Sequence, residues 1–167
     1  MGTDSPLAAD TARLYEKYSD MLYRIAIMHS ENSEDAADAV QDVFLSFMRG
    51  NIRFNSDEHE KAWFIRSVIN RSRDIRRRNK VRAYEDLSAA ENIAAKEHFS
   101  SENVSVLEAL ERLPEKLRSV IVLHYLEGMS IEQTAKTLKL TQSAVKMRLS
   151  RGRDSLRDIL NTEGFNV

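Results

Sequence analysis

The sequence predicts an all-α protein made of two small helical domains. Apolar residues recur at spacings of three and four over most of the chain, which is the periodicity of amphipathic helices. The 167 residues include five glycines and two prolines, which are too few for the many turns of an all-β fold. A polar, acidic segment with weak periodicity covers 83–104. The predicted domains are therefore 8–82 and 105–163, joined by this segment as a flexible linker.

Three helices are expected in the N-terminal domain. The first ends near Ser30 and has its apolar stripe at Leu14, Tyr18, Leu22, Ile25 and Met28. Ser33 is the expected N-cap of the second, since acidic residues fill its first turn, and its core face contains Ala36, Ala39, Val40, Val43, Phe44, Phe47 and Met48. Gly50 ends this helix. Ser56 or Asp57 caps the third helix, whose core face contains Ala62, Ile65, Val68, Ile69 and Ile75.

The C-terminal domain contains the pattern of a helix-turn-helix. Pro114 suits the first turn of a helix that runs to about Leu126, and Gly128 is expected to end it. Residues 130–133, Ser-Ile-Glu-Gln, form a capping-box pattern that opens a short helix. After a three-residue turn, Gln142 opens a basic helix of the kind that enters the major groove of DNA. A plain helical hairpin with a solvated basic face is the alternative interpretation.

The formal net charge of −1 conceals two basic patches. Residues 70–82 and 136–157 each contain seven Lys or Arg and one Asp, whereas 83–111 contains seven acids and one Lys. This asymmetry predicts polyanion binding at two places, although a single such patch is more often a solvated face.

Several motifs together resemble one known family. Residues 113–160, above all 126–135 and 144–153, resemble domain 4 of the extracytoplasmic-function (ECF, group IV) sigma factors. Residues 35–45, and 62–65 (Ala-Trp-Phe-Ile) with Asn70 and Asp74, resemble their domain 2. The resemblance covers almost the whole chain in family order and spacing. It implies an alternative bacterial sigma factor that binds core RNA polymerase and directs promoter recognition, DNA melting and transcription initiation, without catalysing a reaction itself.

The resemblance also implies three groups of site residues. Docking on the clamp helices of polymerase is expected of Asp38, Gln41, Asp42 and Leu45. Contact with the −10 promoter element is expected of Arg53, Phe54, Asn55, Trp63, Asn70, Arg71, Asp74, Arg77 and Arg78. Contact with the −35 element is expected of Gln142, Ser143, Lys146, Met147, Arg148, Ser150 and Arg151. Lys139 stands where the family often has a turn glycine, and Met147 where a small polar residue is frequent. The implied partners are core polymerase, through its clamp helices and flap, promoter DNA and an anti-sigma factor.

Other classes of function have less support in the sequence. The chain has no cysteine, no apolar run near the length of a membrane span and no signal-peptide pattern, so a cytoplasmic protein without membrane insertion is expected. No cofactor, metal or catalytic site is expected, because the four histidines are scattered and no P-loop or His-Glu-x-x-His motif occurs. A LuxR-type or other stand-alone helix-turn-helix regulator is the main alternative, although such proteins carry a strand-rich domain first. A phage or plasmid protein that binds polymerase without starting transcription is the third.

Overall fold

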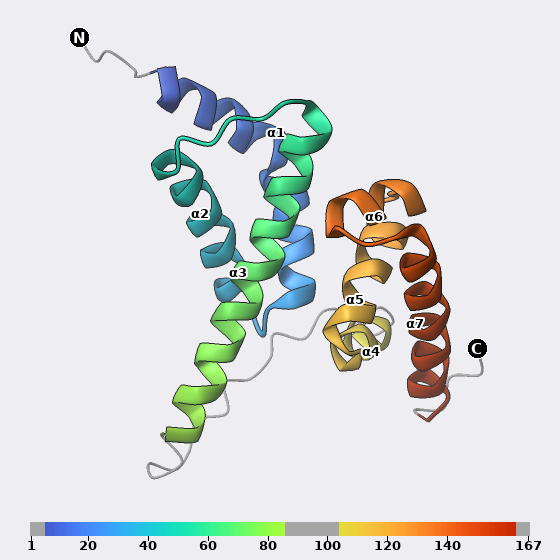
Figure 1. Ribbon diagram of the computed structural model, residues 1–167. Helices are drawn as coiled ribbons and strands as arrows, with labels where there is room; N and C mark the ends of the chain where they lie inside the picture. The colour runs from blue at the N-terminus through green and yellow to red at the C-terminus, as the bar shows by residue number, and fades with distance from the viewer. Residues whose placement is uncertain (1–5, 86–103, 163–167) are drawn as a thin grey trace. The chain divides into compact units, whose positions relative to one another are not determined.

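The computed structural model describes residues 6–85 and 104–162, and no strand occurs among them (Figure 1). The chain divides into two compact units, Met1–Ala95 and Lys96–Val167. The N-terminal unit contains α1 (Pro6–His29), α2 (Ser33–Arg49) and α3 (Asp57–Glu85). The C-terminal unit contains α4 (Val104–Arg112), α5 (Glu115–Ile121), a π-helical segment (Val122–Leu126), α6 (Ile131–Leu138) and α7 (Gln142–Thr162). The predicted two-domain, all-α fold is confirmed.

Both ends of the predicted linker are helical in the structure. Residues 83–85 are the last turn of α3, and Val104 already belongs to α4. The rest of the predicted linker, 86–103, lies outside the described residues.

The core of the N-terminal unit lies where its three helices pack against one another. Phe64 of α3 is fully buried and its ring contacts both Phe44 and Phe47 of α2, with centroids 5.2 and 5.6 Å away. The predicted stripe of α1 is buried as expected. Burial of this apolar surface is the main force that holds the unit together.

Two sequence predictions for α2 are wrong. The N-cap is Asn32 rather than Ser33, because the Asn32 backbone is extended and its side-chain oxygen accepts a hydrogen bond of 2.8 Å from the Asp35 N–H. Met48 was expected in the core but is 41% exposed. It lies at the end of the apolar stripe, where the helix surface turns toward solvent.

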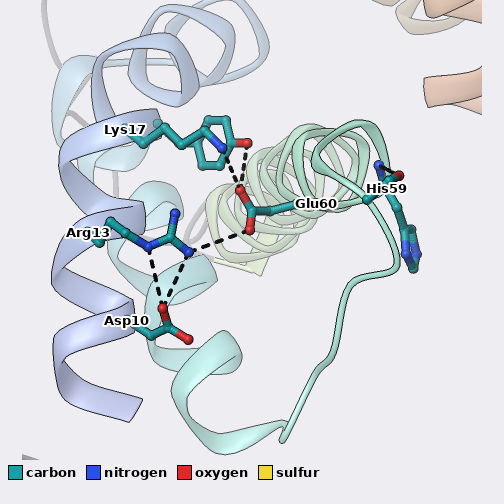
Figure 2. Close-up of polar contacts among 7 residues, drawn as sticks. Asp10, Arg13, Lys17, His59 and Glu60 are labelled. Atoms are coloured by element: carbon teal, nitrogen blue, oxygen red, sulfur yellow. Dashed lines mark hydrogen bonds and ion pairs between the residues drawn. The ribbon is translucent and has the colours of Figure 1, made fainter. Parts of the chain in front are cut away.

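A buried carboxylate ties the start of α3 to α1. Glu60 is 7% exposed, and its Oε1 accepts hydrogen bonds of 2.9 Å from Lys17 Nζ and 2.8 Å from the Tyr18 hydroxyl. Figure 2 shows Arg13 and Lys17 of α1 directed at this carboxylate, with Arg13 Nη2 3.9 Å from Oε2. Burial alone raises the pKa of Glu60, but the two hydrogen bonds and the positive charges of Lys17 and Arg13 outweigh burial, so the pKa lies below its usual value.

A buried arginine organises the C-terminal unit. Arg118 of α5 is 3% exposed, and its guanidinium donates to the backbone oxygens of Leu110, Glu111 and Leu113 at the end of α4. The last carbonyls of a helix lack their usual partners within the helix, so Arg118 helps to satisfy groups that are costly to bury without a donor; the Leu110 carbonyl also accepts from the Leu113 N–H. This contact fixes α5 against the end of α4.

The helix-turn-helix signals of the sequence are confirmed. Ser130 Oγ accepts from the Gln133 N–H at 3.0 Å, and the Gln133 side chain accepts from the Ser130 N–H at 2.9 Å. Gly128 has a φ of +65°, which suits its predicted role as a helix stop. The turn after α6 contains Lys139 at a φ of 55°, the left-handed conformation that favours glycine.

Candidate nucleic-acid and polymerase interfaces

The outer face of α2 carries three of the four residues predicted to dock on polymerase. Asp38, Gln41 and Leu45 are exposed, and they follow one another at spacings of three and four along the helix. Asp42, the fourth, is half-buried and faces α3 instead.

A groove of about 530 Å³ runs between α1 and α2 beside these residues. Its walls include Gln41 and Leu45 together with three apolar side chains that the sequence analysis did not assign to a site, Tyr15, Tyr23 and Met48. Both tyrosines lie off the buried stripe of α1, and that position was the only signal in the sequence. The groove extends the exposed face of α2 with apolar surface.

The opposite side of α2 meets α3 in a charged cleft of about 380 Å³. Arg71 Nε donates to Asp42 Oδ2 at 2.6 Å, and Arg71 Nη2 reaches the same oxygen. Asn79 Nδ2 donates to Asp35 Oδ2 at 2.9 Å, and Arg78 also lines the cleft. Asp42 and Arg71, predicted for two different partners, therefore contact each other.

The loop between α2 and α3 is built on an aromatic cluster. Phe54 stacks on Phe47, with ring centroids 5.9 Å apart and planes 8° apart, and its centroid is also 5.9 Å from that of Trp63. Phe54 and Trp63 are half-buried, whereas Arg53 and Asn55 on either side of Phe54 are exposed. The loop presents polar groups next to the partly open edges of two aromatic rings.

Only some of the −10 residues predicted on α3 are exposed to solvent. Asn70, Arg77 and Arg78 are exposed, and Asp74 is half-buried with its carboxylate 3.5 Å from Arg77 Nη2. The guanidinium groups of Arg77 and Arg78 thus lie at the surface, where they attract an anion.

The predicted −35 residues lie on the exposed side of α7. This set consists of Gln142, Ser143, Lys146, Met147, Ser150 and Arg151. Arg148 is half-buried and lies at the margin of this face. Val145, Leu149 and Gly152 point to the core, and a Cβ on Gly152 would be 2.9 Å from Ile121 Cγ1. Because glycine has no Cβ, α7 can approach α5 closely at Gly152, and this close approach sets the orientation of the basic face.

Two family models match the chain. Residues 14–82 match Sigma-70 region 2, and residues 103–156 match Sigma-70 region 4. These matches define a two-domain sigma factor. The chain is 34% identical over 157 residues to the ECF RNA polymerase sigma factor SigM of Mycobacterium tuberculosis, covering 93% of this chain and 80% of SigM. The chain therefore belongs to the ECF family of RNA polymerase sigma factors, alternative sigma factors that direct transcription initiation.

Other relatives and solved structures agree with this assignment. The RNA polymerase sigma factor SigV of Bacillus subtilis is 26% identical over 145 residues, covering 86% of this chain and 87% of SigV. CnrH, solved in complex with the cytosolic domain of CnrY, is 26% identical with a TM-score of 0.69, covering 92% of this chain and 89% of CnrH. RpoE, solved with the anti-sigma factor NepR from Bartonella quintana, has the same fold at 22% identity and a TM-score of 0.66, covering 91% and 97%. Within residues 6–85 and 104–162, none of the helices combines the length and the apolar composition of a membrane-spanning segment.

Proposed function

We propose that this sigma factor docks on core RNA polymerase through the outer face of α2. The observation that carries the proposal is the exposure of Asp38, Gln41 and Leu45, of which Gln41 and Leu45 line a partly apolar groove and Asp38 borders the charged cleft. A carboxylate, an amide and an apolar side chain suit a partner helix with a basic, partly apolar face, which the family resemblance assigns to the clamp helices. Tyr23 and Met48 enlarge the apolar part of this surface.

The −10 element is proposed to bind the aromatic loop and the outer side of α3. A base that leaves the duplex loses its stacking, and the rings of Phe54 and Trp63 with the polar groups of Arg53 and Asn55 offer a replacement. Residues farther along α3 would follow the DNA strand, and this set consists of Asn70, Asp74, Arg77 and Arg78. Its arginines attract phosphates without reading sequence.

The −35 element is proposed to bind α7 in the major groove. Gln142 and Arg151 have the hydrogen-bonding groups to read base edges, whereas Lys146 meets phosphates as a point charge. Met147 is 51% exposed and would make apolar contact, for example with a thymine methyl group. The C-terminal unit would also contact the polymerase flap.

A binding measurement with purified core polymerase tests the docking surface. Asp38→Lys reverses an exposed charge of the proposed contact, and we expect it to weaken core binding by about tenfold or more, because like charges at an interface cost several kcal/mol. Asp158→Lys is the control, since it makes the same charge change at an exposed position of α7 outside the proposed surfaces. Equal binding by the two variants would remove Asp38 from the interface.

A stand-alone regulator makes a different prediction from a sigma factor. A LuxR-type protein should shift its target DNA in a gel without any partner. We expect this chain to shift a promoter fragment specifically only when core polymerase is present. Specific binding by the chain alone would favour the regulator.

Regulation by an anti-sigma factor is part of the same proposal. The family resemblance supports it, and so does the similarity to CnrH, which is solved in complex with the cytosolic domain of CnrY. The proposed role is exerted in the cytoplasm, where core polymerase works, and it consists of binding rather than catalysis.

A further inference from the structure

The ion pair between Asp42 and Arg71 joins the two helices that the proposed function assigns to different partners. Arg71 directs two N–H groups at one oxygen of Asp42, and each side chain is about one-third exposed, at 36% for Arg71 and 35% for Asp42. The pair is thus partly shielded from water, where a charge-assisted hydrogen bond is stronger than on an open surface.

A second contact repeats the connection farther along the same helices. Asn79 of α3 donates to Asp35 of α2 at 2.9 Å. Going from Asp42 to Asp35 moves seven residues down α2, and going from Arg71 to Asn79 moves eight residues up α3. At 1.5 Å of rise per residue, the two contacts are about 11 Å apart along the helices. Two fixed points at that separation prevent α3 from sliding or rotating on α2.

Arg71 also points in a different direction from Asn70 and Arg77, two of the proposed DNA-binding residues of α3, whereas Arg78 lies on the same side as Arg71 and lines the same cleft. At 100° per residue, Asn70 and Arg77 lie about 20° apart around the helix, whereas Arg71 lies about 100° from Asn70 and about 120° from Arg77. Asn70 and Arg77 are exposed, but the Arg71 guanidinium lies in the cleft against α2.

We propose that Arg71 is a positioning residue rather than a phosphate ligand. Arg71 and Asp42 form an ion pair, here called the clasp, that fixes the position of α3 on α2. Helix α3 carries the proposed −10 contacts, and α2 carries the proposed polymerase contacts. DNA melting requires that the −10 contact residues are held in a fixed position relative to the polymerase. A supporting contact that keeps these residues within a fraction of an ångström of that position preserves function. This inference rests on the proposed function, and it changes the role that the resemblance implied for Arg71.

Salt dependence separates a positioning residue from a phosphate ligand. A side chain that neutralises one phosphate contributes about one unit to the slope of log affinity against log salt concentration. Losing the clasp should disturb promoter opening and leave this slope unchanged. Loss of a phosphate contact should instead make the dependence of log affinity on log salt concentration less steep.

The experiment uses holoenzyme assembled from the full chain and core polymerase, at core concentrations that saturate each variant. The probe is a promoter fragment enriched by wild-type holoenzyme from a randomised library. Promoter affinity is measured over a salt series, and open complexes by permanganate reactivity of unpaired thymines. Arg71→Gln is compared with Asp42→Asn, with the double variant, and with Arg77→Gln as the matched arginine control. Circular dichroism before assembly establishes that each variant is folded.

We expect Arg77→Gln to lower the salt slope by about one and Arg71→Gln to leave it unchanged. Arg71→Gln and Asp42→Asn should each reduce the yield of open complexes severalfold. The double variant should yield no fewer open complexes than the more impaired of the two single variants, because both substitutions remove the same contact. Asp42→Asn makes this test independent of Arg71, since it leaves the arginine in place.

A salt slope that falls by about one in Arg71→Gln would overturn the inference, as would single effects that multiply in the double variant. A wild-type holoenzyme that enriches no promoter would instead overturn the proposed function itself. The two failures are therefore distinguishable.

Discussion

Replacing Glu60 with glutamine should destabilise the N-terminal unit. The substitution keeps the shape of the side chain but removes its charge, so the hydrogen bonds from Lys17 and Tyr18 change from charge-assisted to neutral. We expect Glu60→Gln to unfold more easily than the wild type, with α3 loosened at the end that carries the aromatic loop.

The size of the effect follows from burial. The bond from Tyr18 is buried, and a hydrogen bond to a charged group is worth about 1 kcal/mol more than a neutral one. Lys17 is 38% exposed, so solvent screens its share to about 0.5 kcal/mol. The sum is about 1.5 kcal/mol, which corresponds to a melting temperature about 6–12 °C lower for a domain of this size.

The assay can observe this unit by itself. Trp63 is the only tryptophan of the chain and lies in α3, so tryptophan fluorescence during urea unfolding reports the N-terminal unit. Glu16→Gln is the control, because Glu16 is exposed on α1, where a neutral substitution changes stability by less than about 0.5 kcal/mol. Equal unfolding midpoints for Glu60→Gln and wild type would refute the reasoning.

The pH dependence gives a second test of the same carboxylate. The folded-state pKa of Glu60 lies below its usual value of 4.5, so its stabilising effect is present above pH 4.5 and is lost as the pH falls through the folded-state pKa. The stability difference between wild type and Glu60→Gln should therefore shrink in acid. A difference that stays constant from pH 7 to well below pH 4.5 would show that the charge of Glu60 plays no part.

Three further predictions concern the C-terminal unit and are checked by circular dichroism during thermal unfolding. Arg118→Met should lower the free energy of unfolding by about 3 kcal/mol, because it removes the guanidinium that donates to the carbonyls of Leu110, Glu111 and Leu113; a loss below about 1 kcal/mol would contradict this role. Lys139→Gly should stabilise the unit by about 1 kcal/mol, because glycine adopts the left-handed turn without strain; a lower melting temperature would contradict it. Gly152→Ala should destabilise the unit by about 1–3 kcal/mol, because the new methyl group would overlap Ile121; unchanged stability would mean that Ile121 moves aside freely.

Local patterns in the sequence predicted local structure well. The capping box of Ser130 and Gln133 involves residues three apart, so the sequence alone contained both partners. The N-cap of α2 was misplaced by one residue, since Asn32 and Ser33 are both good caps and only the extended backbone of Asn32 decides between them. The π-helical end of the helix before Gly128 had no signal in the sequence.

Contacts between distant residues were beyond the sequence analysis. Glu60 meets Lys17 across 43 positions, and Arg71 meets Asp42 across 29, so neither contact follows from helical periodicity. Most residues that the resemblance assigned to α2 and α7 are exposed, but Asp42, which it grouped with the polymerase contacts, and Arg71, which it grouped with the DNA contacts, bind each other. Packing between helices decides which charges of a basic patch reach the surface.

The same limit applies to the groove beside α2. Tyr15 and Tyr23 belong to α1 and Met48 to α2, and only the packing of these helices places the three side chains together. The spacing of Asp38 and Leu45 predicted an exposed face, but the sequence did not indicate its apolar extension.

We propose that this chain starts transcription only as a subunit of RNA polymerase. The most direct measurement is run-off transcription from a randomised promoter library, with the purified chain and core polymerase added separately and together. We predict transcripts only from the combination, on templates that share one sequence near −10 and another near −35. Transcripts from unrelated templates, or none above core polymerase alone, would contradict the claim.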